Sequence, residues 1–124
     1  MERAGDVVKL FYDAVIKRDF ATARKHLKGD LIFRGLFKTY YSADEYIADL
    51  NMLMQITARL NVKRIISEED NAVIFFELET KGPVEATTLV AEYHQTREGQ
   101  IAYMESAFDG RPFDAMFAAS SQDS

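Results

Sequence analysis

The chain has 124 residues, a formal net charge of −5 and no cysteine. This length suits one domain with its own core, and the lack of cysteine excludes disulfides, thiolate metal ligands and a cysteine nucleophile. The 15 basic residues are scattered in short pairs among 20 acidic residues. We therefore expect no nucleic-acid partner, because such binding draws most of its affinity from phosphate neutralisation.

The N-terminal part of the sequence predicts two amphipathic helices. Apolar residues recur at helical spacing after Asp6, which we expect to cap the first helix. Asp19 is the expected cap of a shorter second helix, and Gly29 is expected to end it in a left-handed conformation.

A short strand and a third helix are expected next. The strand "LIFR" covers residues 31–34 and leads into an aromatic loop, "LFKTYY". The stretch from Ser42 to Glu45 reads as a capping box, in which each side chain bonds the backbone of the other. It predicts a helix running to about Ala58.

From there the hydrophobic period changes to alternation, which is typical of strands. Four alternating segments are separated by the turns "EEDN", "KGP" and "REGQ", which predicts an antiparallel meander. The predicted fold is α+β, a curved antiparallel sheet wrapped around helices in the order α-α-β-α-β-β-β-β. We expect one domain over residues 1–113 and a polar, frayed tail over 114–124.

The closing segment "EYHQTREGQIAYMESAFD" carries a family resemblance. Gly99 precedes Ile101 in a turn, and Asp109 follows Ile101 by eight residues. With the element order, this resembles the nuclear transport factor 2-like (NTF2-like) superfamily and its SnoaL-like polyketide cyclase branch. The resemblance implies a cystatin-like cone whose open end holds a small, mostly apolar molecule, and a homodimer through the sheet.

Asp109 and Glu105 are the candidate acids. Alternation places Ile101, Tyr103, Glu105 and Asp109 on one face, so both carboxylates point inward if Ile101 does. A carboxyl among apolar side chains can hold or take a proton near neutral pH, and the resemblance gives Asp109 the role of general acid/base. The alternative is that both are solvated or paired with arginine, with Asp109 bonding the backbone of its own turn.

Tyr12 and His94 complete the catalytic candidates. Tyr12 on the first helix could donate to an oxyanion, and His94 on the long fourth strand could orient a substrate. A lone histidine is more often a hydrogen-bonded core or surface residue. No glycine-rich phosphate loop or histidine cluster with metal-ligand spacing occurs, so we expect neither cofactor nor metal.

Several large apolar side chains could line a ligand cavity, although plain core packing explains most of them as well. The loop between the first strand and the third helix could be a lid or an anchor for that helix. The candidates are Phe11, Phe33, Phe37, Tyr41, Met54, Phe76 and Tyr103.

These expectations combine into two functional interpretations. One is a SnoaL-like domain that binds an apolar small molecule and performs cofactor-free acid/base catalysis of the isomerase, cyclase or hydrolase type. The other is a non-catalytic ligand-binding or dimerisation module, and the sequence leaves the choice open. The acidic start "MERAGDVVKL" and the lack of a long apolar run predict a cytoplasmic protein without a membrane partner.

Overall fold

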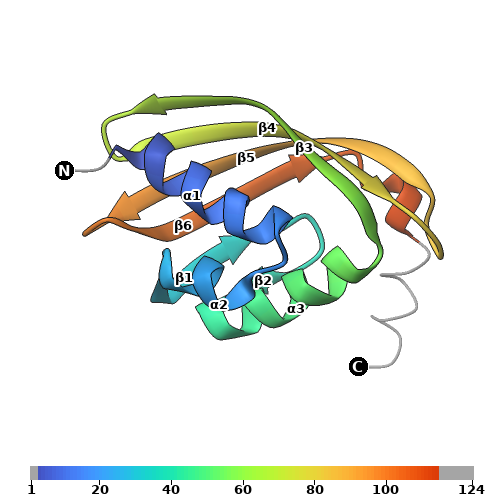
Figure 1. Ribbon diagram of the computed structural model, residues 1–124, viewed down its shortest axis with the longest axis horizontal. Coiled ribbons are helices and arrows are strands. Elements are labelled where there is room, and N and C mark those ends of the chain that lie inside the picture. The colour runs from blue at the N-terminus through green and yellow to red at the C-terminus, as the bar shows by residue number, and fades with distance from the viewer. Residues whose placement is uncertain (1–2, 115–124) are drawn as a thin grey trace.

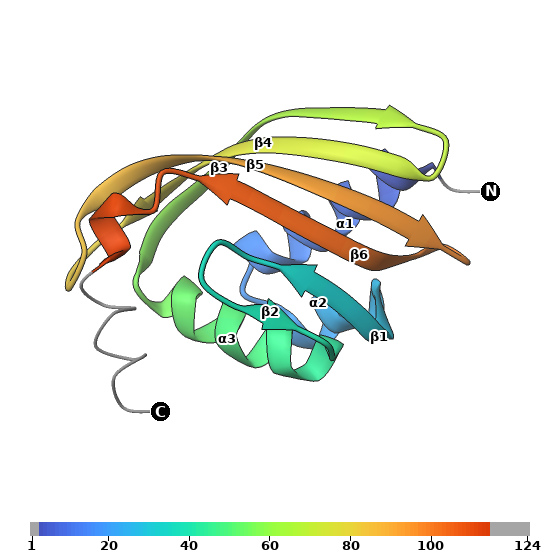
Figure 2. The same cartoon turned by 180° about the vertical axis from the view of Figure 1, so that it is seen from behind.

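The computed structural model describes residues 3–114, and the expected frayed tail therefore lies outside the described residues except for Asp114. Its three helices are α1 (Ala4–Ile16), α2 (Phe20–Lys25) and α3 (Ala43–Gln55). All three lie on the concave side of one curved sheet, whose long strands arch over α1 (Figures 1 and 2). None of the helices in the described part is long and apolar enough to cross a membrane.

The sheet has six strands in the order β2-β1-β6-β5-β4-β3. Neighbouring strands are antiparallel except β1 and β6, which pair in parallel. A short 3₁₀ helix, η1 (Arg111–Phe113), follows the last strand. The strands are β1 (Leu27–Arg34), β2 (Thr39–Tyr40), β3 (Thr57–Glu68), β4 (Asn71–Thr80), β5 (Ala86–Arg97) and β6 (Gln100–Phe108).

The predicted α+β fold is confirmed, with two differences in the sheet. The predicted meander is present as β3 to β6, but the parallel β1–β6 pair makes the sheet mixed rather than antiparallel throughout. The aromatic loop also contains an additional short strand, β2, which pairs with the end of β1.

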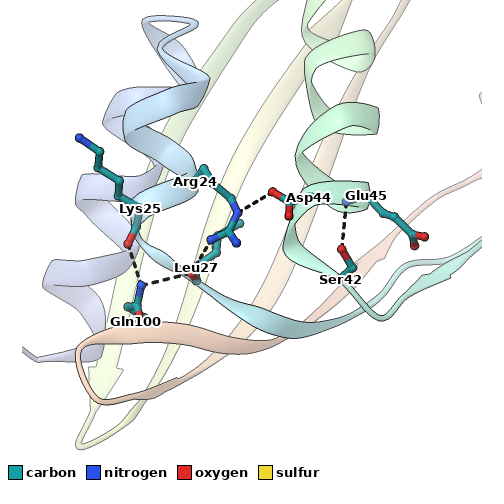
Figure 3. Close-up of polar contacts among 7 residues, drawn as sticks. All are labelled: Arg24, Lys25, Leu27, Ser42, Asp44, Glu45 and Gln100. Carbon is teal, nitrogen blue, oxygen red and sulfur yellow. Dashed lines mark hydrogen bonds and ion pairs between the residues drawn. The ribbon is translucent and has the colours of Figure 1, made fainter.

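Two of the predicted helix caps are confirmed. The Asp19 carboxylate accepts a hydrogen bond from the Thr22 backbone N–H at 3.2 Å. The Ser42 hydroxyl oxygen accepts one from the Glu45 backbone N–H at 3.3 Å (Figure 3). Each bond satisfies a backbone donor that has no partner within its helix. The reciprocal half of the predicted capping box is wrong, because among the described residues the Glu45 carboxylate accepts no hydrogen bond from the Ser42 backbone.

Other predicted boundaries are wrong. The first helix begins at Ala4, so Asp6 lies within its first turn rather than at its cap. The carboxylate there still favours the helix, because it faces the positive end of the dipole. Gly29 does not end α2; it lies inside β1, which begins at Leu27.

Polar contacts connect α2 to its neighbours on both sides (Figure 3). The Arg24 guanidinium pairs with the Asp44 carboxylate at 2.9 Å, which joins α2 to the start of α3. The Gln100 side-chain amide donates to the backbone carbonyls of Lys25 at 2.9 Å and Leu27 at 3.2 Å. The beginning of β6 is thereby held against the connection between α2 and β1.

A β-bulge in β6 sets which side chains face inward. Gln95 pairs with Tyr103, but Thr96 pairs with Ile101, so β6 carries one extra residue, Ala102, between the two pairs. Such an extra residue reverses the alternation beyond it. Ile101 and, three residues later, Met104 are both completely buried.

Candidate functional site

A cavity of about 140 Å³ lies between α1, α3 and the concave face of the sheet. A cavity of comparable volume, engineered in another protein, is large enough to bind benzene. Its polar lining residues are Tyr12, Tyr46, Thr88, Glu92 and Ser106. The remaining walls are apolar and consist of Leu50, Leu53, Met54, Leu60, Phe76, Leu78, Val90, Phe108 and Phe113.

The alternation of β5 directs a carboxylate into this cavity. Thr88, Val90, Glu92 and His94 are all buried, and they occupy every second position of the strand. Residues with this spacing share one face of a strand. Because Val90 faces the apolar interior, Glu92 must face it as well. The exposed fraction of Glu92 is 4%.

Two phenols from different helices lie at the same wall as Glu92. Tyr12 on α1 donates its hydroxyl proton to Glu92 Oε1. Burial, and then the negative charge of Glu92, raise the pKa of Tyr12 well above its usual value. The same two causes, in the same order, raise the pKa of Tyr46 on α3. Both phenols therefore stay protonated at neutral pH and act as hydrogen-bond donors.

His94 lies behind Glu92, next to Tyr12. The His94 ring is completely buried, and its Nε2 is 3.0 Å from Glu92 Oε1. Neither ring nitrogen nevertheless has a hydrogen-bond partner among the described residues. The Tyr12 ring meets the imidazole edge-on, with centroids 6.1 Å apart. Two predicted catalytic residues, Tyr12 and His94, thus meet at a carboxylate that we did not predict.

The two predicted acids lie outside the cavity. Asp109 and Glu105 are both exposed on the outer face of the sheet or in the turn beyond it. Glu105 accepts a hydrogen bond from the Tyr103 hydroxyl at 3.0 Å. The inward position expected from Ile101 is wrong, because the bulge at Ala102 reverses the alternation before these residues.

Asp109 has the contacts expected if it is not catalytic, namely an arginine partner and a hydrogen bond within its own turn. It pairs with the Arg111 guanidinium at 2.6 Å and accepts a hydrogen bond from the Arg111 backbone N–H at 3.1 Å. The hydrogen bonds from Arg111 lower the pKa of Asp109 to about 2. A carboxyl with this pKa remains ionised at neutral pH and holds no proton to give.

Among the predicted ligand-binding residues, Met54 and Phe76 line the cavity. Phe33 stacks on the ring of Tyr46, with centroids 4.6 Å apart, and Phe11 stacks on it at 6.5 Å. Phe11 and Phe33 therefore hold a cavity residue in place without being part of the wall.

The other three predicted ligand-binding residues lie farther away. Tyr103 is on the outer face of the sheet, and Tyr41 is 66% exposed. Phe37 packs against Phe108, a wall residue, with ring centroids 6.2 Å apart. The aromatic loop thus touches one end of the cavity through Phe37.

Glu92 is the main residue that the sequence analysis missed. A signal for it exists in "TLVAEYHQT", where alternation from Val90 leads to Glu92 and then to His94. An acid on the apolar phase of a strand is unusual enough to suggest a site. Within residues 3–114, no cluster of acidic, histidine or cysteine side chains has the grouping needed for a metal ion.

The fold is similar to that of solved NTF2-like proteins. No protein-family model matches the chain, and no curated protein matches it in sequence. An NTF2-like protein of unknown function from Cytophaga hutchinsonii superposes with a TM-score of 0.80 at 19% identity, covering 91% of this chain and 96% of its own. The predicted resemblance to the NTF2-like superfamily is thus confirmed at the level of the fold.

Two further similar structures have names that refer to enzymes. An LEH-like epoxide hydrolase from M. tuberculosis has a TM-score of 0.74 and 18% identity, with 94% of this chain and 90% of that chain covered. A proposed polyketide cyclase from Sinorhizobium meliloti has a TM-score of 0.74 and 13% identity, with 82% and 94% covered. At these identities the likeness concerns the fold.

Proposed function

We propose that the chain binds a small, mostly apolar molecule in the cavity and that Glu92 exchanges a proton with it. The observation that carries this proposal is a carboxylate, 4% exposed, in an otherwise largely apolar wall. Isolated carboxylates are costly to bury, so a retained one is a candidate functional group. The epoxide hydrolase-like and cyclase-like neighbours lend support, because they are consistent with a SnoaL-like domain.

The surroundings of Glu92 suit cofactor-free acid/base chemistry. Water is largely excluded by the apolar walls, which strengthens electrostatic interactions inside the cavity. The Tyr12 hydroxyl orients the carboxylate by donating to Oε1. Tyr46 supplies a second phenol at the same wall, and a phenol can stabilise an oxyanion that forms when a proton is removed.

Proton exchange on a small ketone tests this activity. Cyclohexanone suits a cavity of about 140 Å³, and NMR in D₂O measures deuterium uptake at the carbons beside its carbonyl. We expect the wild type to accelerate the uptake and Glu92→Gln to lose the acceleration. Glu105→Gln is the matched control, because Glu105 is exposed on the outer face. Equal rates for wild type and Glu92→Gln would exclude the acid/base role.

A second candidate function, dimerisation, is favoured by the outer face of the sheet. Leu89 is 56% exposed and Ile66 is 53% exposed there. Phe75 on β4 and Tyr93 on β5 lie between them, and both side chains face outward from the sheet. We propose that a second copy of the chain covers this surface, since exposed apolar patches commonly mark interfaces.

Light scattering tests the dimer. We expect the wild type to have the mass of two chains and Leu89→Lys to have the mass of one. Met52→Lys is the control, because Met52 is 66% exposed but lies on α3, on the other side of the molecule. A wild-type mass of one chain at high protein concentration would contradict this proposal.

A further inference from the structure

The cavity wall carries the carboxylate of Glu92, and the buried ring of His94 lies behind it, with Nε2 3.0 Å from Oε1. Within residues 3–114, Glu92 is the only charged residue that lines the cavity. No lysine or arginine of the described residues lines this wall, so a ligand carboxylate or phosphate placed beside Glu92 would be repelled by it. We therefore expect anionic ligands to be disfavoured.

The hydrogen-bonding capacity of Glu92 is also largely unused. An ionised carboxylate offers about four acceptor positions. Tyr12 occupies one of them, at Oε1. His94 Nε2 approaches the same oxygen at 3.0 Å without forming a hydrogen bond. A ligand that carries a hydrogen-bond donor at its polar end can therefore use the remaining acceptor positions.

Aromatic rings surround the carboxylate. The rings of Tyr12 and Phe76 lie 5.3 Å apart at the wall beside Glu92, and Tyr46 also lines the cavity. Aromatic faces attract cations as well as apolar groups. A ligand with a positively charged hydrogen-bond donor could bond the carboxylate and lie against the aromatic rings. An apolar group about one ring in size would fit the volume of the cavity.

We propose that the ligand of this cavity is a small primary or secondary amine, bound in its protonated form with its nitrogen against Glu92. This inference rests on the proposed ligand-binding function and specifies the chemical class of the ligand. The ammonium group carries the charge opposite to that of Glu92 and donates to the acceptor positions that Tyr12 leaves free. The apolar body, about one ring in size, fills the volume between α3 and the sheet.

Four probes of nearly equal shape test the charge preference: benzylamine, benzyl alcohol, toluene and benzoate. Calorimetry or NMR titration at pH 7 measures each affinity. We expect benzylamine to bind at least about tenfold more tightly than benzyl alcohol, since hydrogen bonds between charged groups are stronger than neutral ones. Toluene should bind more weakly than benzyl alcohol, and benzoate should not bind.

Variants then assign the preference to one residue. Glu92→Gln should bind benzylamine about tenfold or more weakly than the wild type while binding toluene unchanged. Glu105→Gln should leave all four affinities unchanged, because Glu105 lies on the outer face. Circular dichroism checks that Glu92→Gln is folded. If the variant does not fold, the order of the four probe affinities on the wild type still tests the amine proposal.

Two failures have different meanings. If benzyl alcohol binds the wild type as tightly as benzylamine, the charge of Glu92 does not select the ligand; the amine proposal is then wrong, while ligand binding stands. If none of the four probes binds, the proposed ligand-binding function fails together with the amine proposal.

Discussion

Replacing Tyr12 by phenylalanine removes one hydroxyl and tests how strongly that hydroxyl stabilises the buried carboxylate. The ring keeps its contacts with Phe11, at a centroid distance of 5.0 Å, and with Phe76, at 5.3 Å. Tyr12 is 2% exposed and Glu92 4%, so water cannot readily replace the lost donor. Hydrogen bonds to charged groups contribute about 1.5–3 kcal/mol, and we expect the free energy of unfolding to fall by about 2 kcal/mol.

A double-mutant cycle with Glu92→Leu separates this hydrogen bond from other effects. Glu92→Leu alone leaves the Tyr12 hydroxyl without its acceptor, which costs about 1–3 kcal/mol, but it also removes a charge that is unfavourable to bury. In the double variant neither polar group remains. We expect its stability to approach or exceed that of the wild type, as found when buried polar groups are replaced together by apolar ones.

Urea unfolding at pH 7, followed by circular dichroism, measures all four proteins. Tyr103→Phe is the control, because the Tyr103 hydroxyl donates to Glu105 Oε2 at 3.0 Å in an exposed position on the outer face. We expect this control to lose no more than about 1 kcal/mol. The reasoning is refuted if Tyr12→Phe loses less than about 0.5 kcal/mol, or if the two single effects simply add in the double variant.

Three further predictions concern other parts of the molecule. NMR should show Asp109 titrating near pH 2. Because the pKa of Asp109 is lowered in the folded state, the stability from its pairing with Arg111 should be fully present above the unfolded-state pKa and be lost as the pH falls toward 2. Asp109→Asn should leave probe affinities within about twofold, and a larger loss would place Asp109 in the site. Gly5→Ala should lower the free energy of unfolding by about 1–2 kcal/mol despite the better helix propensity of alanine, since its Cβ would lie 2.8 Å from Ser67 Cβ; increased stability in urea would contradict this. Phe113→Ala should lower the free energy of unfolding by about 3–5 kcal/mol and admit larger ligands, because Phe113 is 4% exposed and forms part of the cavity wall. Thermal unfolding and titration with naphthalene measure the two effects, and unchanged values would contradict this role.

Features with local causes could be predicted from the sequence. The caps Asp19 and Ser42 act on backbone groups three residues away, so the sequence window contains the whole interaction. The alternation of the long strands is also local, since side chains on a strand change face at every residue. Contacts between distant segments could not be read in this way. The parallel pairing of β1 with β6 depends on residues more than sixty positions apart.

The candidate site depends on contacts between segments that are far apart in the sequence. Tyr12 and Glu92 are 80 positions apart, and nothing near either residue indicates that they bond each other. The sequence suggested Tyr12 for its residue type and its helix, whereas Glu92 looked like one of the many acids of an acidic chain. Only the packing of α1 against the inner face of β5 makes them partners.

The bulge at Ala102 shows how a single extra residue decides the chemistry of the cavity. With regular alternation from the buried Ile101, Tyr103 and Glu105 would have pointed inward, and the cavity would have held a second carboxylate next to Glu92. Two carboxylates at close range disfavour each other's ionisation, so one of them would hold a proton. The bulge instead turns Met104, Ser106 and Phe108 inward and leaves Glu92 as the only acid in the described wall. The proposed amine ligand depends on this single carboxylate in the described wall.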